Sequence, residues 1–224
     1  LHTAYRRQRQ MCIRDRNIRW LCENSHAHLH VDLIAGLPGE DVASFARGFD
    51  RLLELKPHEI QFGILKRLRG TPIIRHTAEY GLVFDPHPPY TILATDRIDF
   101  NEMQQLVRFA RYWDLIANSG RFAHTLPLIL REMPFANFMR LSNWLYANTD
   151  ATHRIALERL AVLVRQWLVT EGMDEEAAAE LLRSDYAGQA NTKLKTQAAR
   201  KQAVTEEKKA CLLYTSPSPR DATL

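Results

Sequence analysis

Between residues 28 and 65, the apolar positions form two short runs separated by one helical repeat. The first run, in HLHVDLIAG (28–36), is bounded by glycine and proline, which is typical of a strand buried on both faces. Apolar residues then recur at helical spacing from Glu40 to Leu55, and Pro57 ends this helix. The segment EIQFGIL (59–65) predicts a second strand. Strand, helix and strand with short joints form a βαβ unit, whose two strands lie parallel.

Beyond Gly70 the apolar period becomes mostly helical. We expect a short helix near 73–79 and then an ordered connector that is rich in proline. Five further helices are predicted, at 99–117, 121–132, 135–147, 151–170 and 174–184. Asp99 followed by Glu102 matches a capping box, and Asp150 and Thr152 are expected to cap the fourth of these helices. The predicted class is therefore α/β followed by mostly α, and the apolar-poor residues 186–210 favour a disordered or frayed tail.

The two ends of the chain differ from the rest, because both back-translate into sequencing-adapter DNA. Residues 6–16, RRQRQMCIRDR, correspond to DNA that contains AGATGTGTATAAGAGACA, and residues 211–221, CLLYTSPSPRD, correspond to DNA that contains its reverse complement. A basic arm and a Pro/Ser tail are the alternative interpretation. Translated adapter carries no information on the fold. We therefore expect 1–16 and 211–224 to be adapter-derived, and 17–210 to be the biological part.

Excluding these ends changes the charge balance. The whole chain carries 30 Lys and Arg and 26 Asp and Glu residues, a net charge of +4. The end segments hold six of the basic and two of the acidic residues, so the remainder is neutral. A neutral chain without a clustered basic face does not favour nucleic-acid binding. No apolar run of about 18 residues predicts a membrane span. Only Cys22 remains, so no disulfide is possible within the fragment, and we expect a cytoplasmic protein.

The stretch from Val31 to Glu40 holds the candidate binding residues. Gly36-Leu37-Pro38-Gly39 predicts a tight turn at the carboxyl edge of the parallel pair, where ligands approach α/β folds. Glycines at both ends of the turn let the backbone come close to a ligand. The same turn is also explained by local geometry, with no ligand. Both interpretations stay open on these residues alone.

DLIAGLPGED (32–41) resembles the motif on the fifth barrel strand of radical S-adenosylmethionine (SAM) enzymes. IQFGILKRLRGTPI (60–73) is similar to the sixth strand and following turn of the same barrel. PPYTILATDRIDFNEM (88–103) and DLIANSGRF (114–122) resemble a helical C-terminal domain of uncharacterised function found on cobalamin-binding members. The resemblance covers about residues 28–170. It implies the C-terminal strands and helices of a partial (β/α) barrel at 17–80, followed by a helical domain at 81–185.

The resemblance also implies a set of cofactors. Enzymes of this superfamily bind a 4Fe–4S cluster through a Cys-x3-Cys-x2-Cys loop, and the cluster reductively cleaves SAM to methionine and a 5′-deoxyadenosyl radical. The members resembled here hold cobalamin on an upstream domain, and a flavodoxin or ferredoxin is the expected electron donor. One native cysteine does not ligate a cluster that needs three thiolates. We therefore expect an inactive C-terminal fragment of such an enzyme, whose full-length parent acts on a small-molecule or other substrate.

Carried over position by position, the resemblance gives one set of cofactor-binding residues. They are Ile34, Gly36, Leu37, Pro38, Leu65 and Lys66. Ile34 is expected to pack on the adenine of SAM, while Gly36 leaves room for the cofactor. Lys66 borders the adenine from the second strand, and a solvated lysine at a strand end is its alternative role. Gly70 and Thr71 are expected to shape a turn.

His26, His28, His30 and Asp32 alternate along the first predicted strand. Period-two spacing places such side chains on one face, and imidazoles with a carboxylate can bind zinc or iron. Neighbouring side chains on one face of a strand are about 7 Å apart, so three of them rarely converge on one ion. We therefore expect no metal site. His30 and Asp32 are instead candidates for substrate contacts inside the barrel, with structural hydrogen bonding as the alternative.

Two other functions remain compatible with the residues. The helical region could be a non-catalytic docking or lid module, or the chain could be a SAM-independent α/β protein that shares the turn by coincidence. Asn118, Ser119 and Gly120 predict a helix end and a joint to the next helix, although they are also candidates for a site.

Overall fold

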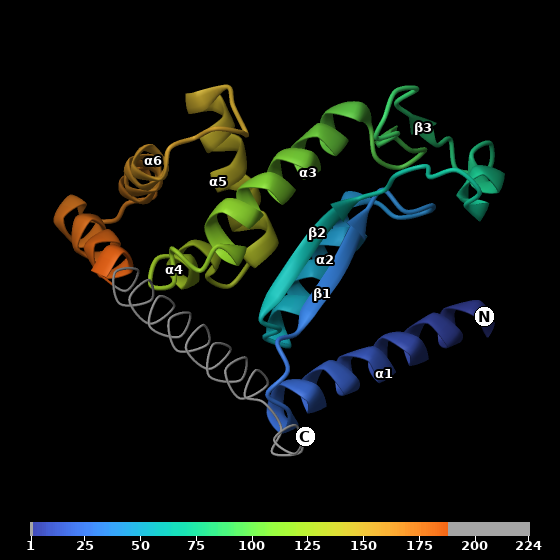
Figure 1. The fold of residues 1–224 in the computed structure, drawn as a ribbon, viewed down its shortest axis with the longest axis horizontal. Helices are drawn as coiled ribbons and strands as arrows, with labels where there is room; N and C mark the ends of the chain where they lie inside the picture. The colour runs from blue at the N-terminus through green and yellow to red at the C-terminus, as the bar shows by residue number, and fades with distance from the viewer. Residues whose placement is uncertain (1, 188–224) are drawn as a thin grey trace, which may run out of the picture.

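The structure is a computed structural model that describes residues 2–187, with side chains described from Ile13 onward. The predicted tail at 186–210, apart from its first two residues, and the segment 211–224 lie outside this range. The described chain is mixed α/β and mostly helical, which confirms the predicted class in general terms. It contains two small sheets and no closed barrel within residues 2–187. Figure 1 shows the longer pair of strands in the middle, the shorter pair towards one side and the C-terminal helices towards the opposite side.

The predicted βαβ unit is present. It comprises β1 (His30–Ala35), α2 (Val42–Glu54) and β2 (Glu59–Ile64). The two strands pair in parallel, and the register runs from His30 opposite Glu59 to Ala35 opposite Ile64. Before this unit, α1 (His2–Asn24) continues through residues 6–16 and ends near the C-terminus of α2. There the Cys22 thiol lies 3.8 Å from the carbonyl oxygen of Leu55.

The helix α2 begins at Val42, two residues after the predicted start at Glu40. Asp41 is its N-cap, since the Asp41 carboxylate accepts a hydrogen bond from the Ser44 amide at 2.6 Å and the Ser44 hydroxyl accepts one from the Asp41 amide. This reciprocal pair is a capping box that uses serine in place of glutamate. Phe45, Phe49 and Leu52 form its buried face, as the apolar spacing predicts.

The proline-rich connector contains strands that the sequence does not reveal. After the 3-10 helix η1 (Pro72–His76), β3 (Val83–Phe84) and β4 (Ile92–Ala94) pair antiparallel. Strands of two and three residues are too short to show an alternating pattern, which is why the sequence predicts only an ordered connector. The pair lies beside the carboxyl end of β2, because the Ile92 amide donates to the Leu65 carbonyl at 2.9 Å.

The remainder is helical. Its elements are α3 (Phe100–Trp113), the π-helical turn η2 (Asp114–Asn118), α4 (Leu126–Leu130), α5 (Pro134–Thr149), α6 (Leu157–Thr170) and a helix at 175–187. The predicted capping box at Asp99 and Glu102 is confirmed. The predicted helix at 121–132 is too long, because only its second half, α4, is an α-helix.

The predicted caps of α6 are wrong. Asp150 has φ 49° and ends α5 in a left-handed conformation, so it is a C-cap rather than an N-cap. Thr152 lies in the loop that follows, and α6 begins only after Ala156. A polar residue next to a predicted helix boundary does not by itself tell whether it caps the helix before it or the helix after it.

One buried apolar cluster joins the strand pair to the helices. Phe109 of α3 is at its centre, with ring centroids 5.3 Å from Phe49 of α2 and 5.0 Å from Phe135 of α5. The Trp113 indole N–H donates to the Ile60 carbonyl of β2 at 3.1 Å, which fixes the end of α3 against the sheet. The cluster extends from β1 to the helix at 175–187, so the two predicted parts of the chain share a core.

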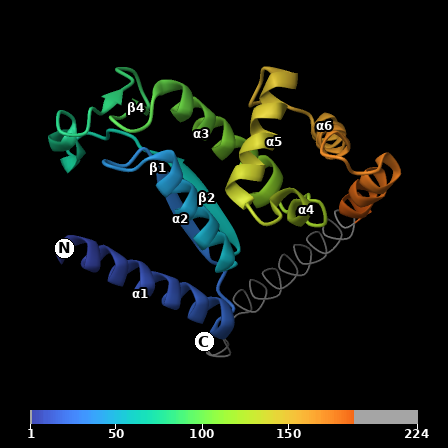
Figure 2. The same ribbon diagram turned by 180° about the vertical axis from the view of Figure 1, so that it is seen from behind.

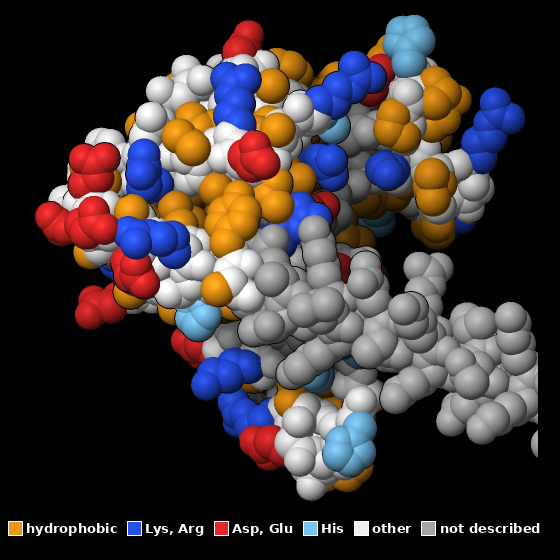
Figure 3. Space-filling view, turned by 60° about the vertical axis from the view of Figure 1, so that its left-hand side comes forward, with side chains coloured by type: hydrophobic (Ala, Val, Ile, Leu, Met, Phe, Trp, Pro, Cys, Tyr) orange, Lys and Arg blue, Asp and Glu red, His pale blue; other side chains and the backbone are white. Residues whose placement is uncertain are grey.

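The helix at 175–187 is tied to the bundle by a buried carboxylate. Asp185 accepts hydrogen bonds from the His124 amide at 2.7 Å and from the Thr125 hydroxyl at 2.5 Å. On the surface, acidic and basic side chains are intermingled over the helical part in the view of Figure 3, with apolar side chains between them. None of the helices within residues 2–187 is both long and apolar enough to cross a bilayer.

Candidate functional site

The strand pair has one covered face and one open face. Side chains of β1 and β2 alternate between the two faces. One set packs with α2, as the 4.8 Å contact between the rings of Phe45 and Phe62 shows, and α2 lies over this face in Figure 2. The other face has no helix of the βαβ unit on it. It carries His30, Asp32, Ile34, Glu59, Gln61 and Gly63.

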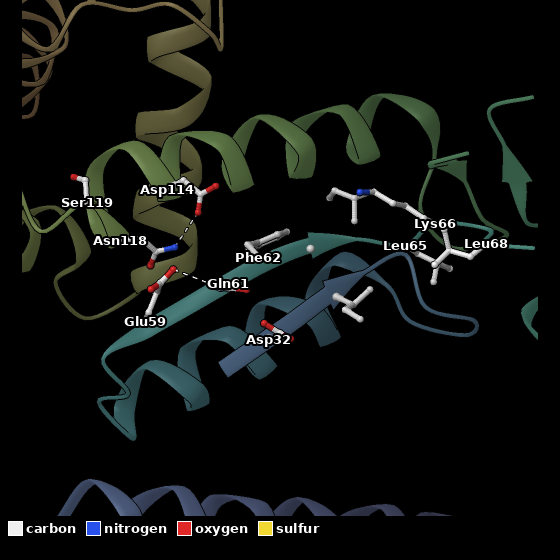
Figure 4. A pocket seen from close by; sticks show the side chains of 13 residues that line it. Asp32, Glu59, Gln61, Phe62, Leu65, Lys66, Leu68, Asp114, Asn118 and Ser119 are labelled. Atoms are coloured by element: carbon white, nitrogen blue, oxygen red, sulfur yellow. Dashed lines mark hydrogen bonds between the residues drawn. The ribbon is translucent and has the colours of Figure 1, made fainter. Parts of the chain in front are cut away.

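A pocket of about 770 Å³ lies on the open face. Asp32, Ile34, Leu65 and Lys66, four of the residues predicted from the sequence, are part of its lining. Figure 4 shows Asp32 and Glu59 near the start of the two strands and Leu65 and Lys66 at the far end. The arrangement therefore brings together the predicted adenine-facing positions of both strands.

The helical part closes one side of this pocket through Asp114, Asn118 and Ser119, and Asn118 contacts the strand. Its side-chain amide donates to the Ile60 carbonyl and to the Asp114 carboxylate, each at 2.9 Å. Ser119 and Gly120 form the helix end that the sequence predicts, with φ 64° at Gly120. The sequence suggested a joint at Asn118, but not that this joint would lie against β2. No local sequence pattern reveals this contact, because it joins two residues that are 58 positions apart in the chain.

Leu65 and Lys66 are held in place by backbone hydrogen bonds beyond the end of β2. The Leu65 amide donates to the Ala35 carbonyl at 3.0 Å, which extends the parallel pairing by one residue. Lys66 forms an isolated bridge with Thr91. Both residues thus have a fixed backbone at the carboxyl edge, while the Lys66 side chain is exposed.

The Gly36 turn lies apart from the pocket lining, and its glycine has a packing role. Gly36 is buried with φ 87°, and a Cβ there would lie 2.7 Å from Cγ2 of Ile92. The close approach is to a side chain of β4, so it accounts for glycine without a ligand. Leu37 is 40% exposed, and neither Leu37 nor Pro38 lines the pocket.

Glu40, directly after this turn, is a half-buried carboxyl group that the sequence did not single out. Its Oε2 atom is buried without a hydrogen-bond partner. Burial, and secondarily the charge of Asp41, raise the pKa of Glu40 to about 7. The group therefore changes its charge near neutral pH, which gives the turn a titratable side chain.

The histidine run behaves differently from the prediction for an isolated strand. His28, His30 and Glu59 offer ligand atoms that all lie within 4.8 Å of one another. The third member comes from β2, because the parallel register places Glu59 opposite His30. The 7 Å spacing applies to side chains within one strand, whereas His28 precedes β1 and Glu59 lies on the neighbouring strand. His26 and Asp32 are not members of this group.

A family model matches more than half of the chain. Residues 78–218 match the model described as "Protein of unknown function (DUF4080)". The matched part begins before β3, includes α3 to α6 and continues past the last described residue, whereas β1 and β2 precede it. None of the curated proteins matches the chain.

Proposed function

The chain belongs to the DUF4080 family, and on that premise we propose that it is the C-terminal part of a radical SAM enzyme. Domains of this family are associated with cobalamin-binding radical SAM proteins. In this proposal β1 and β2 are two strands of a larger (β/α) barrel, and the DUF4080 region is attached to its C-terminal side. The parent enzyme acts on a substrate of unassigned class and receives electrons from a flavodoxin or ferredoxin.

The open face of the strand pair is the observation that carries the proposal. In a (β/α) barrel, helices cover the outside of each strand and the other face points inward. Here α2 covers one face, and the other carries polar side chains together with Ile34, which is 41% exposed. The pocket of about 770 Å³ on this face lies in the size range of small-molecule sites.

The residues of this face have distinct roles in the proposal. Ile34 and Leu65 provide an apolar wall on which the adenine of SAM packs, and Lys66 lies at the rim. Asp32 points into the pocket nearer the amino ends of the strands, where it is available to a substrate. His30 lies on the same face, beyond the lining of the pocket. Gly36 supports this wall indirectly, because its packing against Ile92 fixes the end of β1.

The residues whose side chains the structure describes do not fit a 4Fe–4S cluster. Such a cluster needs three thiolates close together. Cys22 is the one free cysteine within the described side chains. It belongs to α1, and its thiol lies beside the C-terminal end of α2 rather than on the open face. We assign no step of a reaction to the cluster or to cobalamin here. In the proposal both are held by parts of the parent enzyme that precede the strand pair.

The test compares two exposed isoleucines in the longest protein that contains this chain. Ile34→Glu places a charge in the proposed adenine wall, whereas Ile74→Glu places one at a position that is 58% exposed on η1. We expect Ile34→Glu to raise the Kd for SAM at least tenfold and Ile74→Glu to leave it unchanged, as measured by equilibrium binding. Circular dichroism checks that both variants keep their helices.

Two results would overturn the proposal. Equal SAM affinity in both variants would remove Ile34 from the adenine wall. A folded parent protein that shows no SAM binding at all would favour a non-catalytic docking module or a SAM-independent α/β protein.

A further inference from the structure

We propose that His28 and His30 bind a divalent transition-metal ion of the zinc type at the amino end of β1, with Glu59 of β2 orienting His30. The site lies at the opposite end of the strands from the Gly36 turn. It is independent of the proposed SAM wall, so either can fail without the other.

The hydrogen bonds of the cluster set the state of each ring. The Nδ1 atom of His30 lies 2.8 Å from Oε2 of Glu59, so this nitrogen carries the hydrogen and donates it to the carboxylate. The Nε2 atom of His30 then carries no hydrogen in the neutral ring, so its lone pair is available. It faces Nδ1 of His28 at 3.0 Å. Two imidazole nitrogens therefore point at each other, and a carboxylate fixes the tautomer of one of the two rings, that of His30.

This spacing suits a metal ion with little movement. Zinc binds imidazole nitrogen at about 2.0–2.1 Å with tetrahedral angles, so two such nitrogens lie about 3.3 Å apart. The facing nitrogens of His28 and His30 need to separate by only a few tenths of an ångström from 3.0 Å. The ion takes the place of the hydrogen between the rings, and His28 shifts its own hydrogen to the outer nitrogen.

The surroundings orient both ligands. A carboxylate that accepts from the far nitrogen of a ligating histidine is the common second shell of zinc sites, and Glu59 has this place relative to His30. His28 packs on the ring of His58, with centroids 4.7 Å apart. His58 is itself held, because its Nδ1 accepts a hydrogen bond from the Leu29 amide at 3.1 Å. His28 and His30 are both exposed, so water can complete the coordination.

Imidazole ligands select the class of ion. They suit zinc, copper and nickel, whereas magnesium and calcium prefer oxygen ligands. The site is therefore expected to bind zinc and to ignore magnesium.

The experiment is calorimetric titration of tag-free, chelator-treated protein with zinc chloride, and separately with magnesium chloride. We expect one saturable zinc site and no magnesium binding. His28→Ala and His30→Ala should each weaken zinc binding at least tenfold, and Glu59→Gln by about 10–100-fold. His76→Ala is the matched control, since His76 also pairs with a carboxylate, Glu79, but belongs to no metal-ligand group among the described residues. It should leave the affinity unchanged.

Nitrogen NMR of the histidine rings identifies the ligand atoms directly. Zinc should shift Nδ1 of His28 and Nε2 of His30, and leave the ring of His76 unaffected. The proposal is overturned if zinc has no saturable site, or if the site persists in the His28→Ala/His30→Ala double variant. An unchanged zinc affinity in Glu59→Gln would sink the role given to Glu59. Unaltered thermal midpoints in the variants, expected for the exposed His28 and His30 and the partly buried Glu59, exclude loss of the fold as the cause.

Discussion

Replacing Gly36 by alanine tests whether the turn after β1 requires glycine because of packing. Gly36 combines φ 87° with a position where a Cβ would lie 2.7 Å from Cγ2 of Ile92 and 3.2 Å from Cε of Met103. Gly70 offers a matched control, because it has φ 79° with nothing within 4 Å of its Cβ position. The two glycines thus share a positive φ and differ in the space around them.

The expected cost separates into two parts. A left-handed conformation costs an alanine about 1–2 kcal/mol, and this part applies to both positions. Forcing a methyl group into a packed core costs about 1–3 kcal/mol more, and this part applies only to Gly36. We therefore expect Gly36→Ala to lower the free energy of unfolding by about 2–5 kcal/mol, and Gly70→Ala by about 1–2 kcal/mol.

Denaturant unfolding followed by circular dichroism measures both values, and a double-mutant cycle identifies the clash. Ile92 is fully buried, so Ile92→Ala alone should cost about 2–5 kcal/mol through the cavity it leaves. In the Gly36→Ala/Ile92→Ala variant, the new methyl occupies part of that cavity. The combined loss should then be at least about 1 kcal/mol smaller than the sum of the single losses. Equal costs at Gly36 and Gly70, or strictly additive losses with Ile92, would refute the reasoning.

Two further predictions concern single carboxyl groups. Asp185→Asn should lower the free energy of unfolding by about 2–3 kcal/mol. The carboxylate accepts hydrogen bonds from His124 and Thr125 with both of its oxygens, whereas an amide has only one acceptor oxygen. Urea titration measures the loss, and a loss near zero would contradict this prediction. Burial raises the pKa of Glu40 from its ordinary value of 4.5 to about 7 in the folded state. The folded state therefore holds the proton more tightly, and stability should fall as pH rises from about 4.5 to 7. After allowance for solvent screening the fall is about 1–2 kcal/mol, and Glu40→Gln should remove it from the pH profile; a variant with the same slope would refute this origin.

The sequence predicts those parts of the fold that depend on local patterns. The βαβ unit follows from the spacing of apolar residues such as Phe45 and Phe49, and the capping box at Asp99 from the identity of two residues. The short strands β3 and β4 leave no such pattern. The role of Asp150 was missed because its left-handed backbone depends on how the chain leaves α5.

The candidate site was only partly predictable, because some of its residues come from segments that are far apart in the sequence. Ile34 and Asp32 could be placed on one face from their alternation along β1. The partners that complete each group come from elsewhere: Asn118 from the turn after α3, Ile92 from β4 and Glu59 from β2. Only the parallel register and the packing of the helices determine which of these residues meet.

The central claim is that the open face of β1 and β2 belongs to the inside of a larger radical SAM barrel. The most direct test is to determine the complete reading frame that encodes residues 17–210 and to measure iron and sulfide in its purified, anaerobically reconstituted product. We predict a Cys-x3-Cys-x2-Cys loop upstream of β1 and about four iron and four sulfide ions per chain. A complete frame without such a loop, whose folded product binds neither iron nor sulfide, would contradict the claim.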